Sequence, residues 1–345
     1  MTEHKDRLGS VETHVAIQGV CAWPNLTQFA DGTIVATIFN QPTHGRCEGD
    51  TDCWASTDGG EIWSFRGQPC PHEPGTSRMN YSAGLAAGGD MIVMCSGLDK
   101  RVKLSEATQD MGKPNPLQAW VCRSSDQART WQWTGELPDP PAGAAGGCPL
   151  IPFGKAVVAE DGSMRTTVYT QMSGENRWCA FMLVSRDEGC RWEILAPIAN
   201  GGLETDILPV RGGRWLAATR TLARELDLYV SGDDGKTWRL SGPLGLPWQI
   251  PGHLLRLSSG RIVVTYGNRC LNNFGIDARI SDDEGATWRY PFRLANMLDG
   301  DGGYPSSVQR ADGRIVTAFY NKISGAFHYE MSVAAWSTDD YEKPK

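Results

Sequence analysis

Short apolar runs alternate with polar turns along almost the whole chain, and one arrangement of them recurs six times. In each copy, two β-rich runs flank a turn that contains Gly, as in LTQFADGTIVATIF and SVQRADGRIVTAFY. The six segments are residues 26–39, 84–96, 156–169, 207–220, 254–267 and 307–320. Apolar runs around Asp-Gly or Gly-Gly turns predict six β-hairpins.

A second motif, S-x-D-x-G-x-T-W, runs in step with the hairpins. Its five good copies are Ser56–Trp63, Ser124–Trp131, Ser185–Trp192, Ser231–Trp238 and Ser281–Trp288. A shortened sixth copy, STDDY, lies at Ser337–Tyr341. In a turn, Asp accepts backbone N–H groups, Gly adopts positive φ and Trp packs between neighbouring sheets. The motif therefore predicts a turn between two further strands.

Six hairpins that alternate with six such turns predict six four-stranded units, and this repetition is typical of a β-propeller. The last unit stops after its third strand, whereas an orphan strand, Thr13–Val20, precedes the first unit. Pairing the two would close the ring and cover both edges. We therefore expect an all-β fold with one domain over residues 1–345. In this six-bladed β-propeller, an N-terminal strand completes the last blade.

The composition of the chain excludes some classes of binding partner and indicates where the protein works. The 345 residues carry a net charge of −7 without a basic stripe, so nucleic acid is not an expected partner. No apolar run approaches the ~20 residues that span a bilayer, and the first residues lack a secretory signal, so we expect a cytoplasmic protein without membrane contact. Ten Cys without a C-x-x-C pair are expected to be small buried hydrophobes in a reducing compartment, while an oxidised, secreted form stays open. Six His without i, i+4 pairing predict no metal site, and we expect no cofactor.

The turn positions also predict where a ligand binds. Hairpin turns and S-x-D-x-G-x-T-W turns should share one face of the ring, so the opposite face should hold the mouth of a funnel. Counting from the hairpin Gly gives the depth of each polar residue in this mouth. Glu204, Tyr304 and Asn80 lie nine residues before a hairpin Gly and His253 seven before, while Arg220 lies seven and Arg269 nine residues after one.

The repeated motif resembles the Asp-box (bacterial neuraminidase) repeat of the sialidase superfamily, over almost the whole chain. This resemblance implies an enzyme in which a Tyr attacks the anomeric carbon, a Glu takes the phenol proton and Arg side chains hold the sugar carboxylate. It gives these roles to Tyr304, Glu204, Arg220 and Arg269. The acid/base group is expected in NQPTHGRCEGDTDCW, where Asp50 is the first candidate; its rivals there are Glu48, Asp52 and His44.

One departure from the family puts the substrate in question. Sialidases begin the first blade with Arg-Ile-Pro, whereas this chain has CAWPNL, with Ala22 at the Arg position. Losing a bidentate Arg–carboxylate contact costs affinity. Arg46 or Arg78 is the expected replacement from a loop, and the PHEPGTSRMNYSAG segment is expected to contact substrate. Trp23, Trp178 and Trp248 are candidates for stacking on a sugar ring.

Three functions are compatible with these residues. The first is an exo-acting glycosidase that removes a terminal acidic sugar with retention, although inversion stays open. The second is a lyase that uses His44 or His253 with Tyr304 for β-elimination from a uronate-containing polysaccharide. The third is a propeller that binds carbohydrate without catalysis. All three make a glycan the expected partner. The longest insertion, Leu98–Trp120, is expected to form a lid or an oligomer contact.

Overall fold

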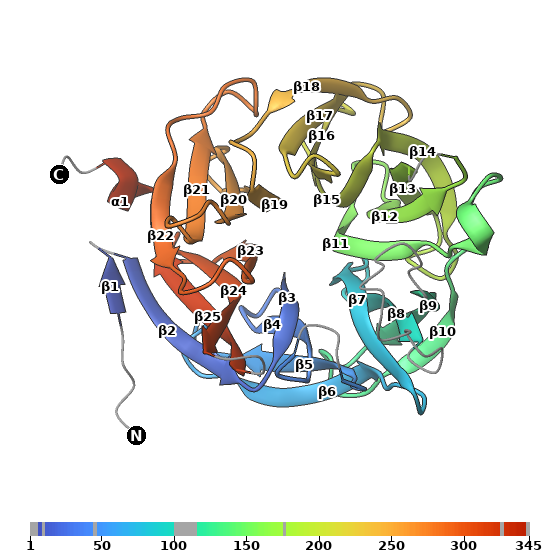
Figure 1. Ribbon diagram of the computed structural model, residues 1–345, viewed down its shortest axis with the longest axis horizontal. Helices are drawn as coiled ribbons and strands as arrows, with labels where there is room; N and C mark the ends of the chain where they lie inside the picture. Colours follow the sequence, from blue (N-terminus) through green and yellow to red (C-terminus); the bar gives the residue numbers. More distant parts are fainter. Residues whose placement is uncertain are drawn as a thin grey trace.

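The structure of the protein, a computed structural model, describes residues 6–8, 11–43, 47–99, 116–174, 177–324 and 328–342. Its antiparallel sheets are arranged around a central axis, which is an all-β, propeller-like fold (Figure 1). Besides strands, the described residues form a short 3-10 helix, η1 (Ala145–Gly147), and one α-helix, α1 (Thr338–Glu342). The all-β prediction is therefore confirmed.

Three sheets have four strands each, in chain order. The first contains β3 (Cys21–Gln28), β4 (Ile34–Phe39), β5 (Thr51–Ser56) and β6 (Ser64–Cys70). The second contains β15 (Gly202–Pro209), β16 (Trp215–Thr221), β17 (Leu226–Ser231) and β18 (Arg239–Pro243). The third contains β19 (Gln249–Arg256), β20 (Ile262–Asn268), β21 (Gly275–Ser281) and β22 (Phe292–Asn296). Each is the strand–hairpin–strand–turn unit that the sequence predicts.

An eight-stranded sheet takes the place of two separate units. One half contains β7 (Thr76–Leu85), β8 (Met91–Asp99), β9 (Pro116–Ser124) and β10 (Gln132–Glu136). The other contains β11 (Ile151–Val158), β12 (Met164–Met172), β13 (Arg177–Ser185) and β14 (Glu193–Asn200). The halves join through a single parallel pair, Ala83 with Lys155, where Gly84 has no side chain to hold Ala156 away. Hydrogen bonding thus divides the described strands into five sheets, not six.

The last sheet brings the two ends of the chain together. It contains β23 (Gly303–Gln309), β24 (Ile315–Ser324), β25 (His328–Trp336), β2 (Val11–Gln18) and β1 (Asp6–Leu8). In it β2 runs antiparallel to β25, with Glu12 opposite Ala335 (Figure 1). The sixth motif copy, STDDY at Ser337–Tyr341, forms no turn between strands. Its second residue, Thr338, is instead the first residue of helix α1. That part of the turn prediction is wrong.

Hydrogen bonds between the Ser, Asp, Thr and Trp side chains and the backbone of the turn explain why the motif recurs. In the copy before β18, Asp233 accepts hydrogen bonds from the backbone N–H of Thr237 (2.9 Å) and from the hydroxyl groups of Ser231 and Thr237. These bonds hold the pKa of Asp233 near 2. Trp238 donates its ring N–H to the carbonyl of Gly235 (3.0 Å). Each turn therefore satisfies its own backbone groups with side chains within four residues.

The core lies between adjacent sheets. Trp63, from the first turn motif, packs in one buried cluster with Ile34 of β4 and Val316 of β24, so it bridges the first and last sheets. Full burial of a side chain of this size contributes about 1.5–3 kcal/mol. All ten Cys lie in the described residues and are free, and seven of them are buried. Residues 100–115 of the insertion lie outside the described part of the chain, so the structure does not test whether the insertion forms a lid or an oligomer contact.

Candidate active site

Bulges at the starts of two inner strands turn polar side chains toward one point. In β15 the register shifts between Gly202 and Thr205, and in β23 it shifts between Gly303 and Ser306. Tyr304 lies inside the second bulge with φ of 51°, a left-handed conformation that is strained for a residue with a side chain. Bulges next to active sites commonly re-aim a side chain in this way.

Three of the predicted residues meet in one hydrogen-bonded triangle. The Tyr304 hydroxyl donates to Glu204 Oε1 over 2.7 Å. Arg220 Nη1 lies 2.9 Å from that same oxygen and 2.9 Å from the Tyr304 hydroxyl. Glu204 and Tyr304 are buried, at 7% and 4% exposure. Tyr304 thus forms one compact unit with Arg220 and Glu204, which lie 84 and 100 positions before it in the chain.

The electrostatics of this unit keep the phenol protonated and the guanidinium charged. Burial, followed by the charge of Glu204, raises the pKa of Tyr304 to about 12, although Arg220 and Arg269 act in the opposite direction. The charge of Glu204 raises the pKa of Arg220 above its ordinary value despite burial. A phenol in this state needs a base to become a nucleophile near neutral pH, and Glu204 Oε1 already accepts its hydrogen bond.

Arg269 lies next to the phenol ring. Its guanidinium carbon is 5.1 Å from the centroid of the Tyr304 ring, and its Nη2 donates to the carbonyl of Gly302 over 2.8 Å. Its Nε is buried without a hydrogen-bond partner among the described residues. A buried guanidinium nitrogen without an acceptor is costly, so it is a natural donor for an anionic ligand.

Aromatic side chains fill the side where a third Arg was expected. Ala22 is fully buried, and the next residue, Trp23, packs edge-on against Tyr304 with ring centroids 5.3 Å apart. Phe153 and Tyr320 complete this wall, each with its centroid 5.8 Å from that of Tyr304. Sequence reasoning missed these last two, although Phe153 also lies nine residues before a hairpin Gly.

The other candidate tryptophans are not in this wall. Trp178 packs against Tyr169 at 5.6 Å, and Trp248 is 44% exposed with Arg224 over its ring.

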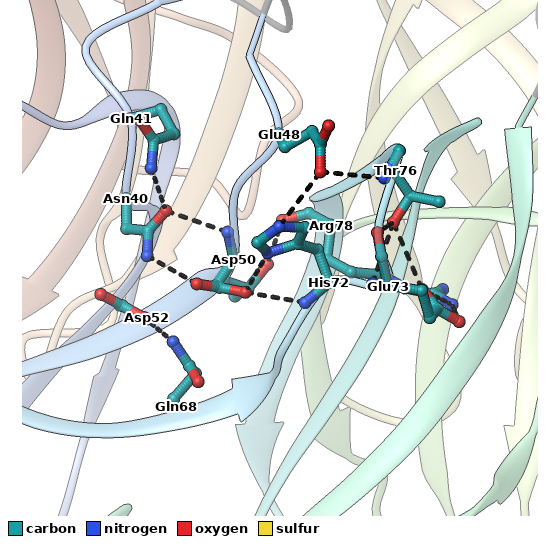
Figure 2. Close-up of polar contacts among 12 residues, drawn as sticks. Asn40, Gln41, Glu48, Asp50, Asp52, Gln68, His72, Glu73, Thr76 and Arg78 are labelled. Atoms are coloured by element: carbon teal, nitrogen blue, oxygen red, sulfur yellow. Dashed lines mark hydrogen bonds and ion pairs between the residues drawn. The ribbon is translucent and has the colours of Figure 1, made fainter. Parts of the chain in front are cut away.

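The loop before β5 forms a separate polar cluster (Figure 2). Asp50 Oδ1 accepts from the backbone N–H of His72 (2.7 Å) and lies 2.6 Å from its Nδ1, while Asn40 donates to Oδ2 over 3.0 Å. Glu48 lies on the far side of the His72 ring at 3.6 Å. Burial raises the pKa of Asp52 to about 6, and Gln68 donates to its carboxylate. His44 and Arg46 lie outside the described residues.

Arg78 is fully engaged elsewhere. Its side chain forms an ion pair with Glu73 (2.9 Å), donates to the carbonyl of Gln118 (2.9 Å) and stacks 3.7 Å above Trp120. At 2% exposure it has no nitrogen left for a sugar carboxylate, which argues against its predicted role as the replacement Arg. Asn80 lies at a bulge of β7, where the register shifts after Arg78.

His253 lies deeper than predicted, in a buried ionic cluster on the axis. It lies seven residues before its hairpin Gly, as do Asp206 and Lys155, two positions beyond Glu204 and Tyr304. Lys155 Nζ contacts Asp206 Oδ2 at 2.5 Å and the carbonyl of Leu254 at 2.6 Å. His253, Asp206 and Tyr304 line one cavity. The sequence signal for this cluster is the shared seven-residue spacing.

Replacing His253 with Gln is expected to flatten the pH dependence of stability between about pH 3 and 6.5. Burial, then the charge of Lys155, lowers the pKa of His253 from 6.5 to about 3, against the opposing effect of Asp206. The unfolded chain binds a proton here below pH 6.5 and the folded chain does not. The free energy of unfolding therefore falls as pH decreases, by up to about 1.4 kcal/mol per pH unit.

Urea unfolding at several pH values measures this slope, and the exposed His328→Gln variant serves as the control that keeps it. Equal slopes for the His253→Gln variant and the unmodified protein would contradict the assignment.

The fold and the site together define a propeller-like protein with a polar cluster at its axis. The chain belongs to the BNR repeat-like domain family, whose model matches residues 98–317. No curated protein sequence matches it.

Solved structures share the fold at low sequence identity. A protein of unknown function from Dyadobacter fermentans is 22% identical, with a TM-score of 0.79 over 96% of this chain and 100% of its own. The Hadza microbial sialidase Hz136 is 17% identical, with a TM-score of 0.70 over 92% of this chain. Trypanosoma rangeli sialidase in complex with the inhibitor DANA is 14% identical, with a TM-score of 0.68 over 97% of this chain. The chain spans 66% and 59% of these two sialidases.

No helix among the described residues is long and apolar enough to cross a membrane. No group of three or more His, Cys, Asp or Glu side chains in that part of the chain is placed to hold a metal ion.

Proposed function

We propose that the protein is an exo-acting, retaining glycosidase of the sialidase type, which removes a terminal acidic sugar from a glycan. The observation that carries the proposal is the hydrogen-bonded triangle of Tyr304, Glu204 and Arg220. Such a reaction requires a nucleophile, a base and a cation in mutual contact, which Tyr304, Glu204 and Arg220 would supply.

In the proposed reaction, the Tyr304 hydroxyl attacks the anomeric carbon while Glu204 takes its proton. A neutral phenol approaches an anionic sugar without the repulsion that a carboxylate nucleophile would meet. Arg269 and Arg220, whose Nε atoms both lack a hydrogen-bond partner among the described residues, hold the sugar carboxylate. A proton donor from the cluster around Asp50 protonates the leaving oxygen.

We also propose that residues 1–345 form one domain with six blades. The two halves of the eight-stranded sheet count as two blades, because one parallel residue pair joins them. The antiparallel pairing of β2 with β25 then completes the last blade and closes the ring.

Of the two histidines in the elimination alternative, His44 lies outside the described residues and His253 is poorly suited to act as the base. A histidine whose pKa lies near 3 is a weak base, and burial keeps His253 away from solvent. A non-catalytic glycan-binding propeller is favoured by one observation, the aromatic wall of Trp23 and Phe153 beside Tyr304 where a third Arg was expected.

A fluorinated sialic acid tests the proposal. With 2,3-difluorosialic acid, the unmodified protein is expected to gain the mass of one fluorosialosyl group, which peptide mapping places on Tyr304. Release of 4-nitrophenol from 4-nitrophenyl sialoside, with retained configuration by NMR, is expected from the same preparation. Binding of sialosides without release or labelling would contradict catalysis and support the binding alternative.

A further inference from the structure

Asp50 is held on both of its carboxylate oxygens. His72 contacts Oδ1 with its backbone N–H and its ring, and Asn40 donates to Oδ2. Asn40 also accepts the backbone N–H of Asp50 over 2.9 Å, so the carboxylate is fixed in position (Figure 2). Burial raises the pKa of Asp50, but the hydrogen bonds from His72 and Asn40 outweigh it and hold the pKa below its ordinary value. Asp50 is therefore ionised near neutral pH and has no proton to donate.

His72 has the opposite properties. An ionised Asp50 is an acceptor only, so the ring nitrogen that faces it, Nδ1, carries a hydrogen. The other nitrogen, Nε2, faces Glu48 Oε2 at 3.6 Å, which is too long for a hydrogen bond. The side chain is 29% exposed, so a ligand can reach Nε2. A carboxylate that fixes one nitrogen and leaves the other free is the arrangement that orients a catalytic imidazole.

The cluster stands on the same face of the ring as the mouth. The Asp50 loop runs beside the start of β7, where Arg78 donates its backbone N–H to the carbonyl of Gly49 over 2.9 Å. From there β7 continues to Asn80, which has the same depth as Tyr304 by its distance to the hairpin Gly. Asn40 directly follows Phe39, which belongs to the buried cluster that contains Tyr304.

We infer that His72, oriented by Asp50, is the acid/base catalyst of this site, an inference that rests on the proposed function. In the first step, Tyr304 Oη bonds to the anomeric carbon, Glu204 takes the phenol proton and the bond to the leaving oxygen breaks. The proton on His72 Nε2 passes to that oxygen. In the second step, Nε2 takes a proton from the attacking water, while Tyr304 leaves the sugar and recovers its proton from Glu204.

Four carboxylates and one Arg surround the imidazole. Glu48 and Asp50 face its ring from the blade-one loop, and Asp52 lies beyond Asp50 on β5 (Figure 2). Glu73 follows His72 in the chain, but its charge is paired with Arg78. The charge around the imidazole is thus mainly negative. Asp52, with its pKa raised to about 6, is the rival proton donor.

The experiment compares two sialosides with different leaving groups. 4-Nitrophenolate leaves without a proton, whereas the alcohol of a methyl sialoside needs one. We expect His72→Gln to reduce kcat/KM for the methyl sialoside by about 10²-fold or more and for the 4-nitrophenyl sialoside by less than about 10-fold. The matched control His14→Gln, in β2, should keep the ratio of the two rates.

A second measurement does not depend on turnover. In ¹⁵N NMR of the imidazole nitrogens, His72 is expected to carry its hydrogen on Nδ1 at high pH, and Asp50→Asn is expected to weaken that preference.

The outcomes separate the two proposals. If the unmodified protein hydrolyses neither sialoside, the proposed function fails and this inference fails with it. If it hydrolyses both and His72→Gln keeps their ratio, only the inference is overturned. A change of ratio in Asp52→Asn and not in His72→Gln would likewise overturn it and make Asp52 the donor.

Discussion

Tyr304→Phe is expected to reduce kcat for 4-nitrophenyl sialoside by at least about 10³-fold while leaving ligand binding nearly intact. The substitution removes the one atom that both Glu204 and Arg220 contact. The ring stays, so its edge-on packing with Trp23 and Phe153 is preserved. Glu204 keeps its ion pair with Arg220 at 2.9 Å, so no buried charge loses its partner. The lost rate therefore reports the nucleophile and not the fold.

Stopped assays of 4-nitrophenol release measure the rate, and calorimetry with a 2,3-didehydro sialic acid measures binding. Tyr266→Phe is a matched control, because this buried phenol lacks a hydrogen-bond partner among the described residues and belongs to another cluster. Full turnover by Tyr304→Phe would refute the assignment of the nucleophile. Loss of binding together with turnover would indicate that the substitution disrupts the site as a whole.

The second large effect concerns stability. Asp206→Ala is expected to lower the free energy of unfolding by about 3–5 kcal/mol, because it leaves a buried ammonium group without its counter-ion. The Asp206 side chain is 1% exposed and that of Lys155 17% exposed, and their charged atoms are 2.5 Å apart. Asp206 Oδ2 also accepts the backbone N–H of Leu254 over 2.7 Å, and this donor would be orphaned.

Chemical unfolding followed by tryptophan fluorescence gives this number. The double variant Lys155→Met/Asp206→Leu removes both charges and is expected to recover much of the loss. Arg186→Ala breaks an exposed ion pair with Glu193 and is expected to change stability by no more than about 1 kcal/mol. A loss from Asp206→Ala as small as that from Arg186→Ala would show that the axial ion pair does not stabilise the ring.

Particular residues show how far sequence reasoning reaches. The spacing to each hairpin Gly placed Glu204 and Tyr304 at one depth, and the two side chains meet at 2.7 Å. His253 was expected at a similar depth in the mouth, but its count is two residues shorter and the side chain is buried at 8% exposure. Asp50 was the expected proton donor, yet its own hydrogen bonds hold it ionised. The hydrogen-bond donors to Asp50 are Asn40 and His72, which lie 10 and 22 positions away, so no short sequence motif shows that they contact it.

The sequence by itself determined the turns and therefore the repeated strands, because each turn is satisfied by side chains within about four residues of its own backbone. It also determined the approximate depth of residues along an inner strand, because each residue advances a strand by a similar distance from its Gly turn. Only the tertiary structure decided which side chains meet across the axis, such as Tyr304 with Glu204 100 positions away. It alone decided that Trp23 and Phe153 line the side where an Arg was expected, and that two units join as one sheet. Burial and charge depend on partners from distant strands, and those partners are set only when the ring assembles.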